Sequence, residues 1–437
     1  MIIVLLILSF LLLFFYTNSL KKTIFGVNIR KGDYLGFFVF YNLIIYIIPS
    51  VLLLNSFPIS SFWVAFKVKA SSVLWISIMI IIVMFCFYWT LYFISKFKPK
   101  YYYINSIDGS FVNEHGRRFV KLSLVLCLFL ISYAWLFNGV GHSFTLSFMD
   151  DVSISTLRSE IAENKSVKAI KHLFIFITPL LAAIAGSSLY NNRKIERNLV
   201  LLIILFIASW GGSKGPLINV LIIYFITRAS FKRMKIKVKT LIQFFVFIFF
   251  IFYITYRVVL FQYPDLVDFS LFFNYFSQRV FVAQMIGVYE QFNLFIHDVR
   301  YTWHGIPFAS SFVDYPIFHK DLMLVSEDRY DATTIGIKNT LFIAEAYGMG
   351  GLVLLVLSPF WIAISFALNY RCMLYIYNKY IFKNLEFSKR ITAISIFSYV
   401  SITGGFSDLM FFKITIMMIL LIMPFLIVNK FIAKVKM

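Results

Sequence analysis

The sequence predicts an all-α polytopic membrane protein with about eleven membrane-spanning helices. Hydrophobic residues make up 60% of the 437 residues and charged residues only 14%, so a water-soluble fold would expose far more apolar surface than water tolerates. The apolar residues are also gathered into segments close to the about 20 residues that cross a bilayer. The net charge of +21 lies mostly in alternating connecting loops, which is typical of a membrane topology and argues against nucleic-acid binding.

The apolar segments predicted to span the membrane are 2–19, 34–54, 73–95, 120–138, 172–190, 198–211, 215–227, 240–260, 340–369, 391–407 and 410–429. The sixth and seventh are short and the last two almost touch, so the sequence fits about ten to twelve spans. The first segment starts at Ile2 with no charged region before it and no small-residue cleavage site after it. It therefore resembles a retained span and not a signal peptide.

The charges of the loops predict how the chain is oriented in the membrane. Alternating loops carry 27 of the 41 Lys and Arg residues but only five of the 20 Asp and Glu residues. Loops rich in Lys and Arg remain in the cytoplasm, so the N-terminus is expected outside and the C-terminus inside. The chain then divides into an N-terminal bundle over 1–255 with an external loop at 139–171, a large external loop at 256–339, and C-terminal helices over 340–437.

The large external loop is too long for an ordinary connection, which usually indicates function. The polar interval Tyr256–Gly351 contains three of the six histidines and half of the carboxylates. Apolar residues at helical spacing in Val258–Phe273 and Val280–Ile296 predict a mostly helical cap.

The shorter external loop contains a helical pattern over Ser153–His172 with a basic face that includes Arg158, Lys165 and Lys168. Two interpretations stay open for it. The helix could lie on the membrane with its basic side chains at lipid phosphates, or the same side chains could hold an anionic ligand.

Two basic residues are candidates for binding an anion. Lys214 lies in the glycine-rich turn Trp210–Pro216, where the backbone can approach a ligand. The alternative is a tight turn whose lysine reaches lipid headgroups.

Arg279 stands at the start of a predicted helix, where the helix dipole disfavours a cation, so an anionic partner is expected. Arg300 and His304 follow in irregular loop, where a solvated surface is the default.

The start of the 340–369 span carries Lys338, Asn339 and Glu345. Lys338 and Glu345 are seven residues apart and share one helix face. A carboxylate in an apolar helix is rarely without function, although a structural ion pair is the alternative.

Together these motifs resemble the O-antigen ligase and Wzy-type O-antigen polymerase families, which are bacterial inner-membrane glycosyltransferases with a large periplasmic loop. The resemblance rests on Gly212-Ser-Lys-Gly-Pro216, on Arg279 followed by Gly287 and Trp303-His-Gly305, and on Lys338-Asn339 before Glu345-Ala-Tyr-Gly-Met-Gly-Gly351. It covers the organisation of the whole chain but motif residues only at these places.

The resemblance implies that Lys214 and Arg279 bind the pyrophosphate of an undecaprenyl-diphosphate-linked oligosaccharide, with Lys338, Arg158 and Arg300 as further basic candidates. Lys338 stands where the ligases have the histidine proposed as base, which favours a polymerase. The implied polymerase works at the periplasmic face, together with membrane lipids, and a chain-length regulator is left open as a partner.

In such a donor the anomeric carbon already carries a good leaving group, so the site must neutralise pyrophosphate and position an acceptor hydroxyl. Glu345, His304 and His319 are, in falling order, the candidates to accept the acceptor's proton. Asp150-Asp151 is a bare pair and no external Asp-x-Asp pattern occurs, so neither a metal nor a cofactor is expected. A flippase of lipid-linked oligosaccharide and an O-antigen ligase remain the alternative functions.

Overall fold

The computed structural model describes most of the chain. The described residues are 2–97, 109–142, 161, 164–211, 214–235, 239, 243, 246, 249, 250, 253, 269–309, 312–328, 338–398, 402, 405–410 and 413–435. Within them every regular element is a helix and no β-strand occurs, which confirms the predicted all-α class. Among the described residues, the segments long and apolar enough to cross a membrane are Ile2–Leu20, Phe37–Ser56, Ala70–Lys96, Glu114–Asn138, Ser166–Gly186 and Phe342–Phe382.

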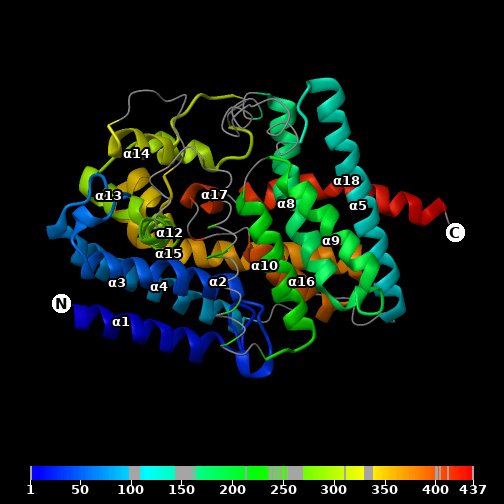
Figure 1. Cartoon of the computed structure of the whole chain (residues 1–437), viewed down its shortest axis with the longest axis horizontal. Helices are drawn as coiled ribbons and strands as arrows, with labels where there is room; N and C mark the ends of the chain where they lie inside the picture. The colour runs from blue at the N-terminus through cyan, green and yellow to red at the C-terminus, as the bar shows by residue number, and fades with distance from the viewer. Residues whose placement is uncertain are drawn as a thin grey trace.

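One group of helices runs along the side of the molecule that carries the N-terminus (Figure 1). It consists of α1 (Ile2–Phe15), α3 (Ile48–Ser56), α4 (Ala70–Lys96) and α15 (Phe342–Ile376), with α2 (Phe37–Tyr41) and η3 (Asn42–Ile47) leading into α3. α4 packs against both α1 and α15. Large apolar side chains such as Phe10 and Leu352 are exposed on the outer faces, as expected for helices that contact lipid.

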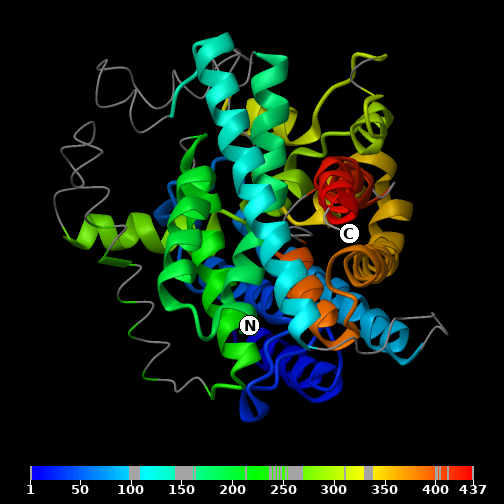
Figure 2. The same ribbon diagram turned by 90° about the vertical axis from the view of Figure 1, so that its right-hand side faces the viewer.

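A second group crosses the first steeply. It contains α5 (Gly109–Asn138), α8 (Lys165–Gly186), α9 (Lys194–Ser209) and α10 (Lys214–Phe231). In Figure 2, α5 is seen along its length while α18 (Lys413–Val435) is seen nearly end-on. α16 (Leu385–Phe397) packs against α8, α10 and α15 and so connects the groups.

The polar interval forms a helical cap at one end of the first group. Its elements are α12 (Phe269–Ser277), η7 (Gln278–Val282), α13 (Ile286–Leu294), η8 (Val299–Gly305) and α14 (Phe318–Ser326). α13 packs against α4, α14 and α15. The helix expected over 280–296 is divided into the π-helical turn η7 and α13, and the expected run 258–273 lies largely outside the described residues.

Two predicted spans are described only in part. Of the span expected over 391–407, the structure describes the end of α16 at Phe397 and the start of a second helix, α17 (Phe406–Met410). Most of the expected span 240–260 lies outside the described residues.

The long helix α15 is itself interrupted. Gly351 has φ 58° and ψ −147°, and the preceding Gly350 has φ −144° and ψ 25°, so neither residue is helical. The φ of Gly351 is in a region that side chains disfavour, which explains the glycine. The break separates a short first segment, which carries Glu345, from the apolar remainder.

Candidate functional site

Glu345 lies fully buried in the first turn of α15. Leu341 is extended, and the N–H of Phe342 donates to the Ile402 carbonyl at 3.1 Å. This contact joins the start of α15 to the segment between α16 and α17. The first turn of a helix favours a negative charge, so this position suits an ionised carboxylate.

Ser407 of α17 binds both oxygens of Glu345. Its backbone N–H donates to Glu345 Oε2 at 2.9 Å, and its hydroxyl donates to Oε1 at 2.7 Å. The N–H groups at the start of a helix lack partners within the helix, so the carboxylate supplies one for α17. Glu345 is thus positioned by two hydrogen bonds, and its side chain is closed to solvent.

His304 of η8 extends this network. Its Nδ1 lies 2.9 Å from Ser407 Oγ and 4.0 Å from Glu345 Oε1. Because the single hydroxyl proton of Ser407 is donated to the carboxylate, Ser407 must accept its other bond from a protonated Nδ1 of His304. A neutral His304 ring therefore has its lone pair on Nε2. Ser407 is not arranged as a nucleophile, since its proton is directed to Glu345 and not to the histidine.

The surroundings of His304 keep its ring neutral. Burial lowers the pKa of His304 below its usual range, and the nearby Lys413 ammonium lowers it further. Lys413, the first residue of α18, donates to the His304 carbonyl at 2.6 Å and pairs with Asp408 Oδ1 at 3.2 Å. The ring is consequently available to accept a proton at neutral pH.

His319 of α14 approaches the same carboxylate. The N–H of Lys338 donates to the His319 carbonyl at 3.1 Å, and His319 Nδ1 donates to the Lys338 carbonyl at 3.0 Å. His319 Nε2 lies 3.1 Å from the position that a Cβ at Gly405 would take, and Glu345 Oε2 is also against that position. The structure therefore brings Glu345, His304 and His319 together around Gly405 and Ser407. These five residues are called the Glu345 cluster below.

Basic side chains lie next to this cluster, at the start of α8. His172 of α8 is within electrostatic range of three lysines, Lys168, Lys171 and Lys413. The Lys413 partner Asp408 is also within this range. The Lys171 side chain packs on Gly211, with its Cε 3.2 Å from the position of a Cβ there.

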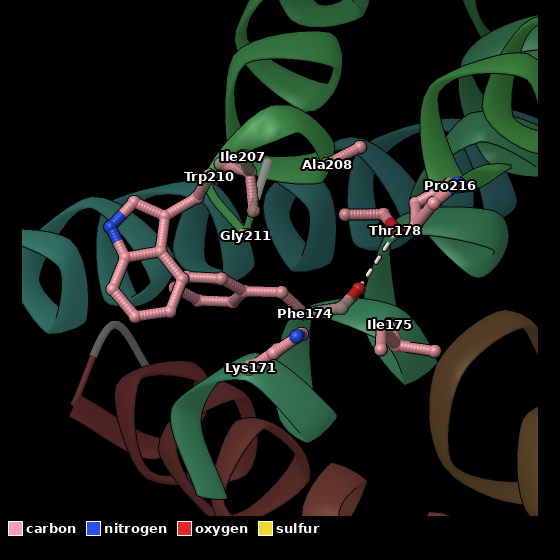
Figure 3. A pocket seen from close by; sticks show the side chains of 9 residues that line it. All are labelled: Lys171, Phe174, Ile175, Thr178, Ile207, Ala208, Trp210, Gly211 and Pro216. Atoms are coloured by element: carbon pink, nitrogen blue, oxygen red, sulfur yellow. Dashed lines mark hydrogen bonds between the residues drawn. The ribbon is translucent and has the colours of Figure 1, made fainter. Parts of the chain in front are cut away.

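Lys171 also borders a small pocket between α8, α9 and α10, which Figure 3 shows. The other lining residues are Phe174, Ile175, Thr178, Ile207, Ala208, Trp210, Gly211 and Pro216. α10 begins at Lys214, two residues before Pro216. The glycine-rich turn selected from the sequence thus lies beside Lys171, and α8 packs against α18.

Lys338 is engaged inside the protein. Its side chain is 7% exposed, its Nζ lies 3.0 Å from Glu290 Oε2 and 3.8 Å from Glu327 Oε1, and it sits 4.7 Å from the centre of the Phe66 ring. Two carboxylates already compensate its charge. This weighs against the expected role of Lys338 in binding pyrophosphate.

The remaining basic candidates are not gathered at the cluster. Arg300 is exposed and forms a bidentate pair with Asp298, in which Nε donates to Oδ1 at 3.1 Å and Nη2 donates to Oδ2 at 2.7 Å. Arg279 is exposed on η7, which packs against α3 and η3. Arg158 lies outside the described residues, and α8 begins only at Lys165.

Sequence reasoning missed Ser407, Asp408 and Lys413. All three fall at or beside the junction of the spans predicted at 391–407 and 410–429. Charged residues within an apolar stretch are functional candidates, so Asp408 and Lys413 carried a usable signal. Ser407 carried none, because its role depends on Glu345, which is 62 residues away in sequence.

The comparisons with known proteins add no relative. No protein-family model, curated protein or solved structure matches the chain. Among the described residues, no group of three or more His, Cys, Asp and Glu side chains is placed to hold a metal ion.

Proposed function

We propose that this chain is a membrane glycosyltransferase that polymerises undecaprenyl-diphosphate-linked oligosaccharide repeat units at the periplasmic face of a bacterial inner membrane. The single observation that carries the proposal is the convergence of Glu345, His304 and His319 in one largely buried cluster bordered by lysines. These residues come from three separate elements. Their sequence motifs resemble those of the O-antigen polymerases.

In the proposed reaction, an acceptor hydroxyl oxygen attacks the anomeric carbon of the donor as the bond from that carbon to the diphosphate oxygen breaks. The diphosphate leaves with the electron pair, and the new glycosidic bond has inverted configuration. The acceptor's proton passes to Nε2 of His304. Lys171 and Lys413, with Lys214 as implied by the resemblance, would offset the charge of the leaving diphosphate.

The geometry changes the order of the candidate bases. Both oxygens of Glu345 are bound by Ser407, and Glu345 is fully buried. His304 is partly accessible and keeps Nε2 available. We therefore assign proton acceptance to His304 and assign Glu345 a positioning role, in which its charge stabilises the protonated ring through Ser407.

The test is His304→Asn in a strain whose own copy is deleted. The asparagine amide can still donate to Ser407 from about the place of Nδ1, but it has no counterpart of Nε2. We expect normal protein levels and loss of the long polysaccharide ladder, with single repeat units still transferred to the outer-membrane lipid. The matched control is His297→Asn, since His297 Nδ1 donates to the Gly348 carbonyl at 2.8 Å.

The same strains separate the alternatives. Lipid-linked single units accumulating on the cytoplasmic leaflet would identify a flippase. Complete loss of glycan from the outer-membrane lipid, while lipid-linked polymer accumulates, would identify a ligase. A normal ladder in His304→Asn would remove His304 as the base.

A further inference from the structure

Far from the Glu345 cluster along the chain, Arg197 in the first turn of α9 is buried with no charged partner in the described part of the chain. Its exposed fraction is 9%, and its Nη1 is buried with no acceptor among the described residues. Nε and Nη2 reach only the neutral amide oxygen of Asn198, at 3.4 and 3.3 Å. A buried guanidinium without a negative partner is costly.

The one carboxylate nearby in sequence cannot neutralise Arg197. Glu196 is the only acidic residue between 187 and 200. It already pairs with Lys121 of α5 at 3.1 Å and with Arg193 at 3.2 Å. Positive charge at the start of α9 therefore exceeds the negative charge of Glu196.

Two further buried donors lie at the same end of the helices. Arg118 Nη2 and Tyr190 OH are buried without a partner in the described part of the chain. Arg118 is three residues from Lys121, so both lie on the face of α5 from which Lys121 reaches Glu196. Tyr190, in η5 (Ser188–Tyr190), is within electrostatic range of Arg117, Arg193 and Glu196. Arg117, Arg118, Tyr190, Arg193 and Arg197 are named the Arg197 cluster below.

Buried donors without acceptors are rare in native proteins. Arg118, Tyr190 and Arg197 come from α5, η5 and α9, three elements that contact one another, so their unpaired donors point to a missing acceptor. Guanidinium groups match phosphate oxygens as paired donors, and a phenol hydroxyl adds a further bond. Arg117 and Arg118 are also near the start of the apolar segment Glu114–Asn138, at the depth of lipid headgroups. We propose that the Arg197 cluster binds a phosphate group, supplied by an anionic lipid headgroup or by free phosphate.

The proposal is independent of the glycosyltransferase assignment, because none of its residues belongs to the Glu345 cluster. Thermal unfolding of the purified full chain tests it. In one series the protein is in detergent, and its unfolding midpoint in inorganic phosphate is compared with that in chloride at equal ionic strength. A second uses nanodiscs of phosphatidylcholine with and without phosphatidylglycerol.

We expect the unfolding midpoint to rise with at least one of these additions. Arg197→Gln and Arg118→Gln should weaken the apparent affinity about tenfold or more, because each removes a charge-assisted hydrogen bond. Tyr190→Phe should weaken it less while keeping the buried ring. Arg300→Gln, which alters only the exposed pair with Asp298, should respond as wild type.

If the unfolding midpoint rises only with phosphatidylglycerol, the ligand is a lipid headgroup. If it rises with inorganic phosphate, the ligand is a soluble phosphate. Without either ligand, Arg197→Gln should unfold no earlier than wild type, because it removes an uncompensated buried charge. The absence of any midpoint shift overturns the proposal. So does a shift that stays unchanged in both Arg118→Gln and Tyr190→Phe, whatever the folding of Arg197→Gln.

Discussion

At the residue scale, the protonation of one histidine is controlled by its neighbours. His304 is affected by burial, by Lys413, and by the opposing charges of Asp408 and Glu345, with His319 also close. Burial and the Lys413 charge dominate, and both lower the pKa. The Nδ1 proton is fixed by Ser407, which in turn is fixed by Glu345. Each of these side chains matters mainly through its effect on Nε2.

This arrangement predicts the pH dependence of activity. A base must be neutral, and a histidine with a lowered pKa stays neutral below its usual value of about 6.5. The wild-type rate should therefore remain level from neutral pH to below that value and fall only as the pH passes the lowered pKa. Lys413→Gln keeps a donor for the His304 carbonyl but removes the charge, so the pKa rises and the acid limb moves to higher pH.

The pH profile of glycosyl transfer in isolated membranes checks this prediction. Lys389→Gln is the control, because Lys389 forms an exposed pair with Glu386 at 2.7 Å. An acid limb at the same pH in Lys413→Gln and wild type would contradict the assignment of His304 as the base.

At the scale of elements, a buried charge cluster attaches the cap to the helices beneath it. Lys338, before α15, pairs with Glu290 of α13 and Glu327 after α14. Glu290 also accepts the N–H of Phe66, in the loop between α3 and α4, at 3.2 Å. Removing the cation would leave two carboxylates in a poorly solvated place.

Lys338→Met should therefore destabilise the fold by about 3–5 kcal/mol, the cost of breaking a buried pair. Burial raises the pKa of Glu290, and Lys338 opposes that rise. Without Lys338, the folded pKa of Glu290 lies still further above its unfolded value. The variant should therefore lose stability as the pH rises from the unfolded carboxyl pKa through the raised folded pKa of Glu290, and recover part of it in mild acid.

Thermal unfolding in detergent at several pH values measures this effect. Adding Glu290→Gln to Lys338→Met should restore part of the stability. Lys67→Met, at an exposed pair with Asp328, should change stability by only ~0–1 kcal/mol. If Lys338→Met were as stable as wild type yet inactive, Lys338 would be a ligand-binding residue after all.

At the scale of the whole molecule, the distribution of charge predicts the orientation. The loops with 27 of the 41 Lys and Arg residues are expected inside. The cap and the Glu345 cluster would then lie on the outer side, where the proposed donor is used. The Arg197 cluster would lie on the inner side, where the anionic leaflet attracts basic groups.

Reporter fusions test the orientation. A fluorescent protein at the C-terminus should fluoresce, because it folds in the cytoplasm, and alkaline phosphatase inserted after Val313 in the cap should be active. Alkaline phosphatase at the C-terminus is the matched control and should be inactive. Activity of that C-terminal fusion would reverse the predicted topology and place the Glu345 cluster on the wrong side for the proposed reaction.

The sequence by itself determined the all-α class and most of the apolar helices, because hydrophobic segments of membrane length are a local property of the chain. It also indicated Glu345, His304 and His319, since ionisable groups in apolar or external positions stand out against such a background. It placed a single span over 391–407, where the structure describes two helices, α16 ending at Phe397 and α17 beginning at Phe406.

Only the tertiary structure decided which of these residues act together. Lys338 and Glu345 share a sequence motif, yet Lys338 is compensated by Glu290 and Glu327 while Glu345 is bound by Ser407. Ser407, Asp408 and Lys413 join the site through contacts between elements far apart in the chain. The physical reason is that hydrogen bonding and charge compensation depend on distances of a few ångströms between such elements, and no local pattern encodes those distances.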